Sequence, residues 1–431
     1  MRARSKPATA VLTHETPDAL LIGALLLFLL IFATASVFVR SAWALQAFQI
    51  GIYAVVAGYL LVGIRRKNET VSSNPLTWPI YLIPVWGVVQ ILTHTTSSTF
   101  TTRAEVLRWG SLVGVFFLAQ VVARSSAARR WFLTIMLCFA TGMAALCLLQ
   151  LFTSDGRVLW LFPTGYPDVF ATFPNHSNYS QFAELALPIV LWRALREGKH
   201  SWWYALAGGI IYASVIGSAS RAGAILCTLE VLAMLLIWLA TRRKSSHGKA
   251  LDRRMRSALA VVGLIPLFAI LFTFAVGWQK VVNRFDTTEP FTGRWEFLVA
   301  ATRMAQERPL TGFGLGTFPE VYQKYAVKDF PFYANHAHND WAEFAADGGI
   351  PFLLLFLVPF AAIIPTAIRH SWGIGLVAVM LHACVDFPFP RPAVSGWMFA
   401  LLAILYIRRE SGSAPPQTPP IERAAARPIS S

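Results

Sequence analysis

Long runs of consecutive apolar residues recur along the chain and constrain its fold more than any other feature. The runs are about 17 to 24 residues long, and a helix that rises 1.5 Å per residue can cross a hydrocarbon core of about 30 Å with that length. Of the 431 residues only 14% are charged, against about 25% in a typical soluble domain. The chain is therefore predicted to be an all-α, polytopic integral membrane protein.

About 12 segments are predicted to span the membrane. They are residues 19–39, 43–64, 78–92, 104–123, 131–152, 179–192, 203–216, 222–240, 257–277, 350–368, 373–385 and 393–407. The third, sixth, seventh and eleventh are shorter than a full crossing, so the count could lie between about ten and fourteen. The intervening segment 278–349 is predicted to be a large loop that contains short helices.

Lysine and arginine residues concentrate in every second loop, for example in residues 65–67 and 242–256. Because cytoplasmic loops retain positive charge, both termini are predicted to be cytoplasmic. The large loop 278–349 then faces outward.

The net charge of +15 would suggest a nucleic-acid partner if it formed one basic surface. The charges lie instead in short clusters at span ends, so we interpret them as topology signals. We expect contacts with membrane lipids and no nucleic-acid partner. The cysteines, Cys138, Cys147, Cys227 and Cys384, all fall inside predicted spans, which disfavours a disulfide or a zinc site.

Two arginines on the outward side are candidates for binding an anion. Arg221 begins the eighth span after the short outward turn 217–220, where a guanidinium and free backbone N–H groups suit a phosphate or diphosphate. Arg221 could also be an interfacial arginine that reaches lipid headgroups. Arg294 begins a predicted helix in the large loop, which Pro309 ends. Together the two guanidiniums could bind a diphosphate and stabilise its departure.

The large loop also contains three glycines at alternate positions in residues 312–316. No strand precedes this segment and no Gly-Lys-Ser/Thr follows it, so a nucleotide-binding loop is disfavoured. We predict a turn that allows close approach of another backbone segment.

The loop ends in a polar segment that carries His336 and His338. An imidazole can take a proton from an attacking hydroxyl near neutral pH, and His338 is the candidate general base. The two histidines could instead bind zinc or a harder cation with Asp340 and Glu343, although a catalytic zinc site usually has three convergent ligands. A third interpretation is that His338 and Asn339 cap the following helix.

Two further polar clusters adjoin predicted spans. Asn175 and His176 precede the sixth span, which contains Glu184, and His382 and Asp386 lie four residues apart at the end of the eleventh. Each cluster could line a cavity open to the outside or form structural hydrogen bonds.

Taken in order, these segments resemble the O-antigen ligase and polymerase superfamily over residues 170–402. The matching segments are Asn175-His176-Ser177-Asn178, Ser220-Arg221-Ala222-Gly223, Gly293-Arg294-Trp295 leading to residues 309–314, His336-Ala337-His338-Asn339 with Gly348-Gly349, and His382 with Val385-Asp386-Phe387-Pro388. Trp341 and Asp347 depart from the Leu and Glu types expected there, which leaves the acceptor open.

The resemblance implies transfer of a glycan from undecaprenyl diphosphate to an acceptor hydroxyl, at the periplasmic face of the bacterial inner membrane and without a metal or other cofactor. It implies that Arg221 and Arg294 hold the diphosphate and that His338 assists the acceptor. Other candidate substrate-binding residues are Asn175, His176, Asn339, His382 and Asp386.

The acceptor would be lipid A-core for a ligase and a growing glycan for a repeat-unit polymerase, and both remain open. A polysaccharide transporter or flippase is an alternative from a different class, because polar residues in a many-helix bundle also mark translocation paths. The predicted organisation is an N-terminal transmembrane bundle (residues 1–169), a ligase-like membrane domain (170–407) and a disordered cytoplasmic tail (408–431), which is rich in Pro, Ser and Ala.

Overall fold

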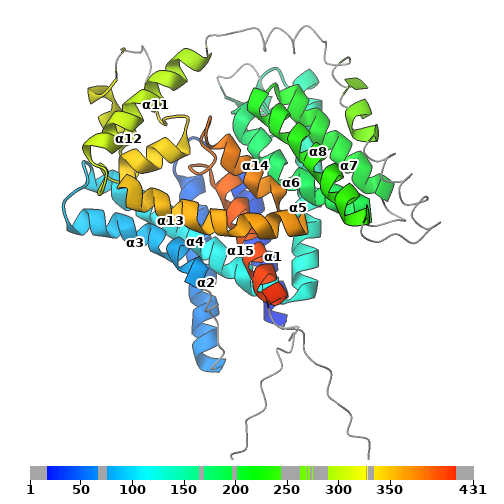
Figure 1. Cartoon of the computed structure of the whole chain (residues 1–431), viewed down its shortest axis with the longest axis horizontal. Coiled ribbons are helices and arrows are strands. Elements are labelled where there is room, and N and C mark those ends of the chain that lie inside the picture. The colour runs from blue at the N-terminus through cyan, green and yellow to red at the C-terminus, as the bar shows by residue number, and fades with distance from the viewer. Residues whose placement is uncertain are drawn as a thin grey trace, which may run out of the picture.

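The computed structural model describes residues 17–66, 75–164, 169–196, 201–243, 263–268, 270–271, 274, 290–326, 328 and 334–413. Helices make up most of these residues, and the single sheet among them is a two-stranded hairpin (Figure 1).

The described helices and strands follow this order along the chain. They are α1 (Pro17–Ala35), α2 (Trp43–Arg66), η1 (Pro75–Thr77), α3 (Trp78–Leu92), α4 (Thr99–Arg124), α5 (Ser126–Thr153), β1 (Arg157–Val158), β2 (Phe162–Pro163), α6 (His176–Arg196), α7 (Ser201–Ser218), α8 (Arg221–Arg243), α11 (Pro290–Glu307), α12 (Phe318–Val321), η2 (Tyr322–Lys324), α13 (Asp340–His370), α14 (Ile374–His382) and α15 (Pro392–Ser413).

Seven described helices are long and apolar enough to cross a membrane, as an all-α membrane protein requires: α1, α2, α3 with η1, α4, α5, α8 and α13. Helices α6, α7 and α15 also occupy predicted positions, although they are not among these seven. Most of the predicted span 257–277 lies outside the described residues. The count of about 12 spans therefore stays a prediction.

Two predicted spans differ from the helices observed. Helix α14 has 9 residues and is about 14 Å long, so it is too short for the crossing predicted for residues 373–385. Helix α13 begins at Asp340, ahead of the predicted span 350–368, and is interrupted at Gly349, where φ is 72°. The apolar pattern identified only the part of α13 that follows this kink.

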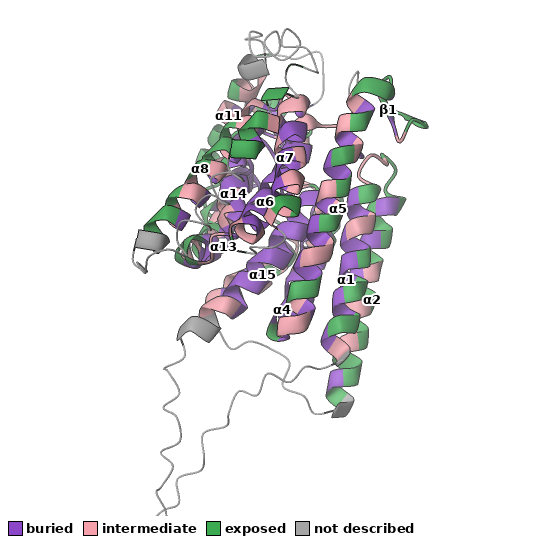
Figure 2. Ribbon diagram, turned by 90° about the vertical axis from the view of Figure 1, so that its right-hand side faces the viewer, coloured by how far each residue is buried: buried purple, intermediate pink, exposed green. Residues whose placement is uncertain are grey.

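Helix α15 lies at the centre of the bundle and packs along α4. Trp109 of α4 is fully buried, and its ring centroid lies 4.9 Å from that of Phe356 in α13 and 6.4 Å from that of Phe399 in α15. Figure 2 shows α4 and α5 running beside α1 and α2, with the β1–β2 hairpin beyond the end of α5. Burial of these large side chains is the main stabilising contribution available to the bundle interior.

The glycine turn 312–316 packs against the kink of α13. Phe313 N–H donates to the Ala346 carbonyl at 3.0 Å, and Gly314 N–H donates to the Asp347 carbonyl at 2.8 Å. The interruption at Gly349 removes a helical acceptor from Ile350 N–H, which donates to the carbonyl of Pro309 at 2.7 Å. The prediction of a turn that permits close backbone approach is confirmed.

Gln90 of α3 forms hydrogen bonds with both the glycine turn and the segment of α13 that precedes its kink. Its amide nitrogen donates to the carbonyls of Thr311 at 2.6 Å and Asp347 at 2.8 Å, and its oxygen accepts from Leu315 N–H at 3.1 Å. Because a buried amide without partners would be costly, a fully bonded Gln90 fixes the position of the loop relative to α3.

The close approach at Gly312 predicts a loss of stability on substitution. Its φ is +64°, and an added Cβ would lie 2.3 Å from the backbone of Asp347. Gly312→Ala is expected to reduce the free energy of unfolding by more than about 1 kcal/mol. Thermal unfolding of the purified protein in detergent measures this change. Gly142→Ala in α5 is the control, because its Cβ would meet nothing within 4 Å. Equal melting temperatures for the two variants would contradict the close packing at Gly312.

Candidate functional site

The short turn between α14 and α15 brings distant polar groups together. It consists of residues 383–386 and is called the 383–386 turn below. Three successive carbonyls accept hydrogen bonds: Ala383 from the N–H of Asp340 at 3.0 Å, Cys384 from Nδ2 of Asn339 at 2.8 Å, and Val385 from Nη1 of Arg294 at 3.1 Å. Helix α11 and the start of α13 are therefore both held against this turn.

The carboxylate of Asp386 ends the turn and contacts a guanidinium and an imidazole. Arg294 Nη2 lies 3.5 Å from its Oδ2, and His338 Nδ1 lies 3.4 Å from its Oδ1. Asp386 is fully buried, whereas the side chains of Arg294 and His338 are about 30% and 27% exposed. The structure thus brings three of the predicted site residues to one point.

The charge of Asp386 is stabilised by its neighbours. Burial alone would raise the pKa of this carboxyl, but the contact with His338 and the guanidinium of Arg294 outweigh burial, and the pKa lies below its ordinary value. Asp386 is therefore ionised at neutral pH. An ionised acceptor at Nδ1 favours the His338 tautomer that carries its proton there, which leaves Nε2 able to accept a proton.

His338 occupies an unusual backbone conformation. Its φ is +53°, in the left-handed region that side chains other than glycine seldom adopt. The following residue, Asn339, is the N-cap of α13, and its Oδ1 accepts from Ala342 N–H at 3.0 Å. The capping role considered for the His–Asn pair thus belongs to Asn339, and the His338 ring is free of that role.

His336 and the two nearby carboxylates have separate partners. His336 Nδ1 lies 3.0 Å from Glu343 Oε1, and Glu343 Oε2 accepts from Ala337 N–H at 2.7 Å. Asp340 Oδ2 accepts from Phe389 N–H at 3.0 Å. Within the described ranges, no group of three or more His, Cys, Asp or Glu side chains is arranged to hold a metal ion. These contacts orient the His-Ala-His segment.

His338 lines a large cavity of about 1310 Å³. One wall is apolar and comes from the end of α1, the start of α2 and the hairpin, with residues such as Phe38, Trp43 and Phe162. Arg40 and Arg391 also line it, and none of its described lining residues is a carboxylate. The cavity therefore combines a large apolar surface with positive charge and a histidine.

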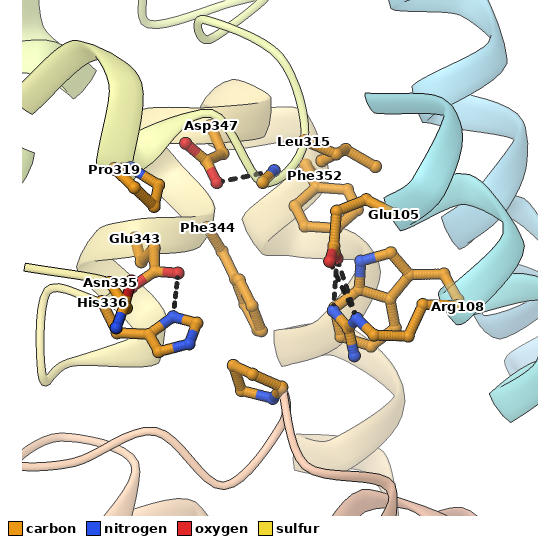
Figure 3. Close-up of a pocket in the computed structure, with 13 residues that line it drawn as sticks. Glu105, Arg108, Leu315, Pro319, Asn335, His336, Glu343, Phe344, Asp347 and Phe352 are labelled. Carbon is orange, nitrogen blue, oxygen red and sulfur yellow. Dashed lines mark hydrogen bonds and ion pairs between the residues drawn. The ribbon is translucent and has the colours of Figure 1, made fainter. Parts of the chain in front are cut away.

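A second, smaller pocket of about 70 Å³ adjoins the first, since Asn335 and His336 line both (Figure 3). Figure 3 shows Glu105 and Arg108 of α4 across this pocket from His336. Arg108 is 5% exposed, and its Nε lies 3.1 and 2.9 Å from the two carboxylate oxygens of Glu105. Its Nη1 donates to the carbonyl of Phe389 at 2.8 Å, and its guanidinium lies 4.1 Å from the Trp109 ring centroid.

Sequence reasoning missed this pair. Glu105 and Arg108 lie inside the predicted span 104–123, and charged residues at membrane depth usually mark a cavity or an ion pair. That signal was available at both positions. The pair now links α4 to the segment that follows Asp386.

The remaining candidates lie around the start of α6. Asn175 lines the large cavity, and its Oδ1 accepts from Ser177 N–H at 2.8 Å. His176 begins α6, with its ring centroid 6.2 Å from that of Phe170. Arg221 begins α8, which packs on α6 so closely that a Cβ at Gly223 would lie 2.4 Å from Ser180 Cβ. Arg221 does not take part in the Asp386 contacts with Arg294 and His338.

His382 lies inside the bundle. It is fully buried, and its Nδ1 is 2.7 Å from Oε1 of Glu184 in α6, which is also fully buried. His382 therefore contacts Glu184 and does not line either of the two cavities described above.

The lowered pKa of Asp386 predicts how stability depends on pH. A carboxyl with a depressed folded-state pKa contributes stability above its unfolded pKa of about 3.9 and loses it as the pH falls towards the folded value. Asp386→Asn should therefore unfold more easily than the wild type at pH 7, by about 2 kcal/mol. The difference in the free energy of unfolding between the wild type and Asp386→Asn should become smaller below about pH 4, where the carboxyl of Asp386 is protonated in the unfolded state.

Thermal unfolding in detergent between pH 3 and pH 7 measures this effect. The exposed Asp155 provides the control Asp155→Asn. A difference between wild type and Asp386→Asn that stays constant over this range would show that the carboxylate charge is not stabilised by its two partners.

One family model matches the chain, with the description O-antigen ligase, over residues 187–357. The matched region runs from within α6 to within α13 and contains Arg221, Arg294 and His338. Asn175, His176, His382 and Asp386 lie outside it. Comparisons with curated proteins and with solved structures gave no match. The match confirms the resemblance seen in the sequence: residues 187–357 are similar to the O-antigen ligase family.

Proposed function

We propose that this membrane enzyme transfers a glycan from undecaprenyl diphosphate to an acceptor hydroxyl at the outer face of the bacterial inner membrane. The similarity of residues 187–357 to the O-antigen ligase family supports glycan transfer in general. The observation that carries the specific proposal is the large cavity, in which His338, backed by the ionised Asp386, lies beside an apolar wall and two arginines.

The cavity suits an amphiphile with an anionic head. The apolar wall fits a polyprenyl chain, because burial of hydrocarbon surface is favourable. Arg40 and Arg391 supply positive charge without a carboxylate among the described lining residues, which favours a diphosphate over a neutral or cationic group. Asn175 and Arg391 immediately precede the N-termini of α6 and α15, whose helix dipoles add to the positive potential.

The proposed reaction is a single displacement. The acceptor oxygen bonds to the anomeric carbon, the bond from that carbon to the diphosphate oxygen breaks, and the configuration inverts. Nε2 of His338 takes the acceptor proton, and undecaprenyl diphosphate leaves with the bonding electrons. A guanidinium has five N–H donors, so Arg294 can hold Val385 and Asp386 and still present donors to the leaving group. In this proposal Arg221 supplies a second positive charge that stabilises the leaving diphosphate.

The distribution of charge supports an outward-facing cavity. The cavity lies at the N-terminal ends of α6, α13 and α15. At the opposite ends of these helices, Arg196, Arg369 and Arg408 surround His370 together with Arg129 of α5. By the positive-inside rule this basic end belongs in the cytoplasm, so the cavity and the large loop would face the periplasm.

Kinetics of two variants test the assigned roles. His338→Asn keeps a residue that tolerates positive φ but cannot act as the base, so transfer should fall by about 10²-fold or more while donor binding persists. The rise of rate with pH should also disappear. Arg294→Lys retains one charge but loses the planar fork, so both donor affinity and rate should fall at every pH.

Donor binding and transfer would be measured in nanodiscs with purified undecaprenyl-diphosphate glycan between pH 5 and 8. Matched controls are His94→Asn, an exposed histidine that shares the positive φ of His338, and Arg303→Lys, an exposed arginine on the same helix as Arg294. A folded His338→Asn enzyme that transfers at the wild-type rate would rule out His338 as the base.

Glycan profiles of a deletion strain separate the possible pathways. Loss of long chains from the lipid anchor, with long chains retained on the carrier, is the result expected for a ligase. Single repeat units remaining on the anchor would identify a polymerase. Unprocessed donor held on the cytoplasmic side would identify a flippase and contradict glycan transfer by this chain.

A further inference from the structure

The buried pair Glu184–His382 has no role in the displacement itself. Its two side chains come from α6 and α14, are both fully buried, and meet at 2.7 Å. Oε2 of Glu184 and Nε2 of His382 have no hydrogen-bond partner among the described residues. A buried ion pair of this kind is weak support for stability, because desolvation offsets the attraction, and it is better attested as a device that fixes one geometry.

The position of His382 connects this pair to the 383–386 turn. His382 is the last residue of α14, and its carbonyl accepts the N–H groups of Val385 at 2.9 Å and Asp386 at 3.0 Å. Earlier in α14, Gly375 brings the helix against α6, since an added Cβ would lie 2.3 Å from the carbonyl oxygen of Glu184. Helix α14, whose end leads into the turn, is thus held against α6 near its start by Gly375 and at its end by His382.

Glu184 and His382 also interact electrostatically with the charged residues of the candidate site. His382 interacts electrostatically with Asp386 and Arg294 as well as with Glu184. Glu184 in turn interacts electrostatically with Asp386, Glu230 and Cys227. In its protonated form His382 offsets the repulsion between the carboxylates of Glu184 and Asp386, which favours the ionised form of Asp386 that holds Arg294 and His338.

We infer that Glu184 and His382 are positioning residues, which fix the 383–386 turn to α6 and thereby orient His338 and Arg294 for the reaction. Neither residue touches substrate in this arrangement. The inference rests on the proposed function for its catalytic consequence, but the fixing of the turn can be measured independently of activity.

The test replaces the pair by apolar residues. A single substitution would leave one buried charge uncompensated and could prevent folding, whereas Glu184→Met with His382→Leu leaves neither charge and often costs little stability in such pairs. The control is Tyr212→Phe with Thr228→Val, which removes a 2.7 Å hydrogen bond between α7 and α8. Size-exclusion chromatography and thermal unfolding in detergent confirm that both double variants are folded.

A spin label on Cys384 reports on the turn without any reaction. Cys384 is exposed and lies within the 383–386 turn, Cys147 and Cys227 are buried, and Cys138→Ser removes the other exposed thiol. In the Glu184→Met/His382→Leu protein the label should become more mobile than in the wild type, while the control should match the wild type. An unchanged spectrum would overturn the inference.

The catalytic consequence is measured on the same proteins. The apolar pair should lower kcat for glycan transfer at least about 10-fold per folded molecule, with the donor KM changed by less than about threefold, because orientation of the base is a transition-state effect. A mobile turn with an unchanged kcat would also overturn the inference. If the wild type transfers no glycan, the proposed function fails, and the label alone decides whether the pair fixes the turn.

Discussion

A single buried carboxylate joins the parts of the chain on which the candidate site depends. Asp386 contacts Arg294 from α11 and His338 from the segment before α13, and these partners are far apart in sequence. An uncompensated carboxylate in this interior would be costly, so the carboxylate is stabilised by Arg294 and His338 only when all three segments are in place. The charge of Asp386 is therefore stabilised only if the large loop docks on the 383–386 turn.

Backbone hydrogen bonds also hold the large loop in place. Outside regular helices, buried carbonyl and amide groups need partners from elsewhere. The 383–386 turn offers its carbonyls to the start of α13 and to Arg294, while the glycine turn 312–316 and the kink at Gly349 exchange backbone bonds with each other. Irregular backbone at the edge of a membrane bundle is tolerated because protein groups satisfy it.

Much of the architecture could be predicted from hydropathy, because a long apolar run has few alternatives to a membrane helix. Helices α1 to α8 fall close to the predicted spans. Helix α14 was predicted too long and α13 too short, since hydropathy does not detect a turn that begins at a buried His382 or a helix that continues through a polar start.

The site was only partly predictable for a related reason. His338, Arg294 and Asp386 stood out as polar residues beside spans, but their mutual contact depends on the tertiary placement of α11 and α13. The partnership of His382 with Glu184, in place of a same-face pair with Asp386, likewise depends on how α14 packs on α6. The roles of Gln90 and the Glu105–Arg108 pair were missed, because these residues lie inside segments recognised by their apolar neighbours.

The left-handed backbone of His338 has a consequence for how this position can change during evolution. Such a conformation costs of the order of 1 kcal/mol or more for most side chains, while glycine adopts it freely and asparagine tolerates it. Replacement of the imidazole by either of these would relax the backbone at the same time as it removed the base. Selection for stability alone would therefore favour losing the histidine, and its retention in a lineage would measure how strongly that lineage depends on the chemistry of the ring.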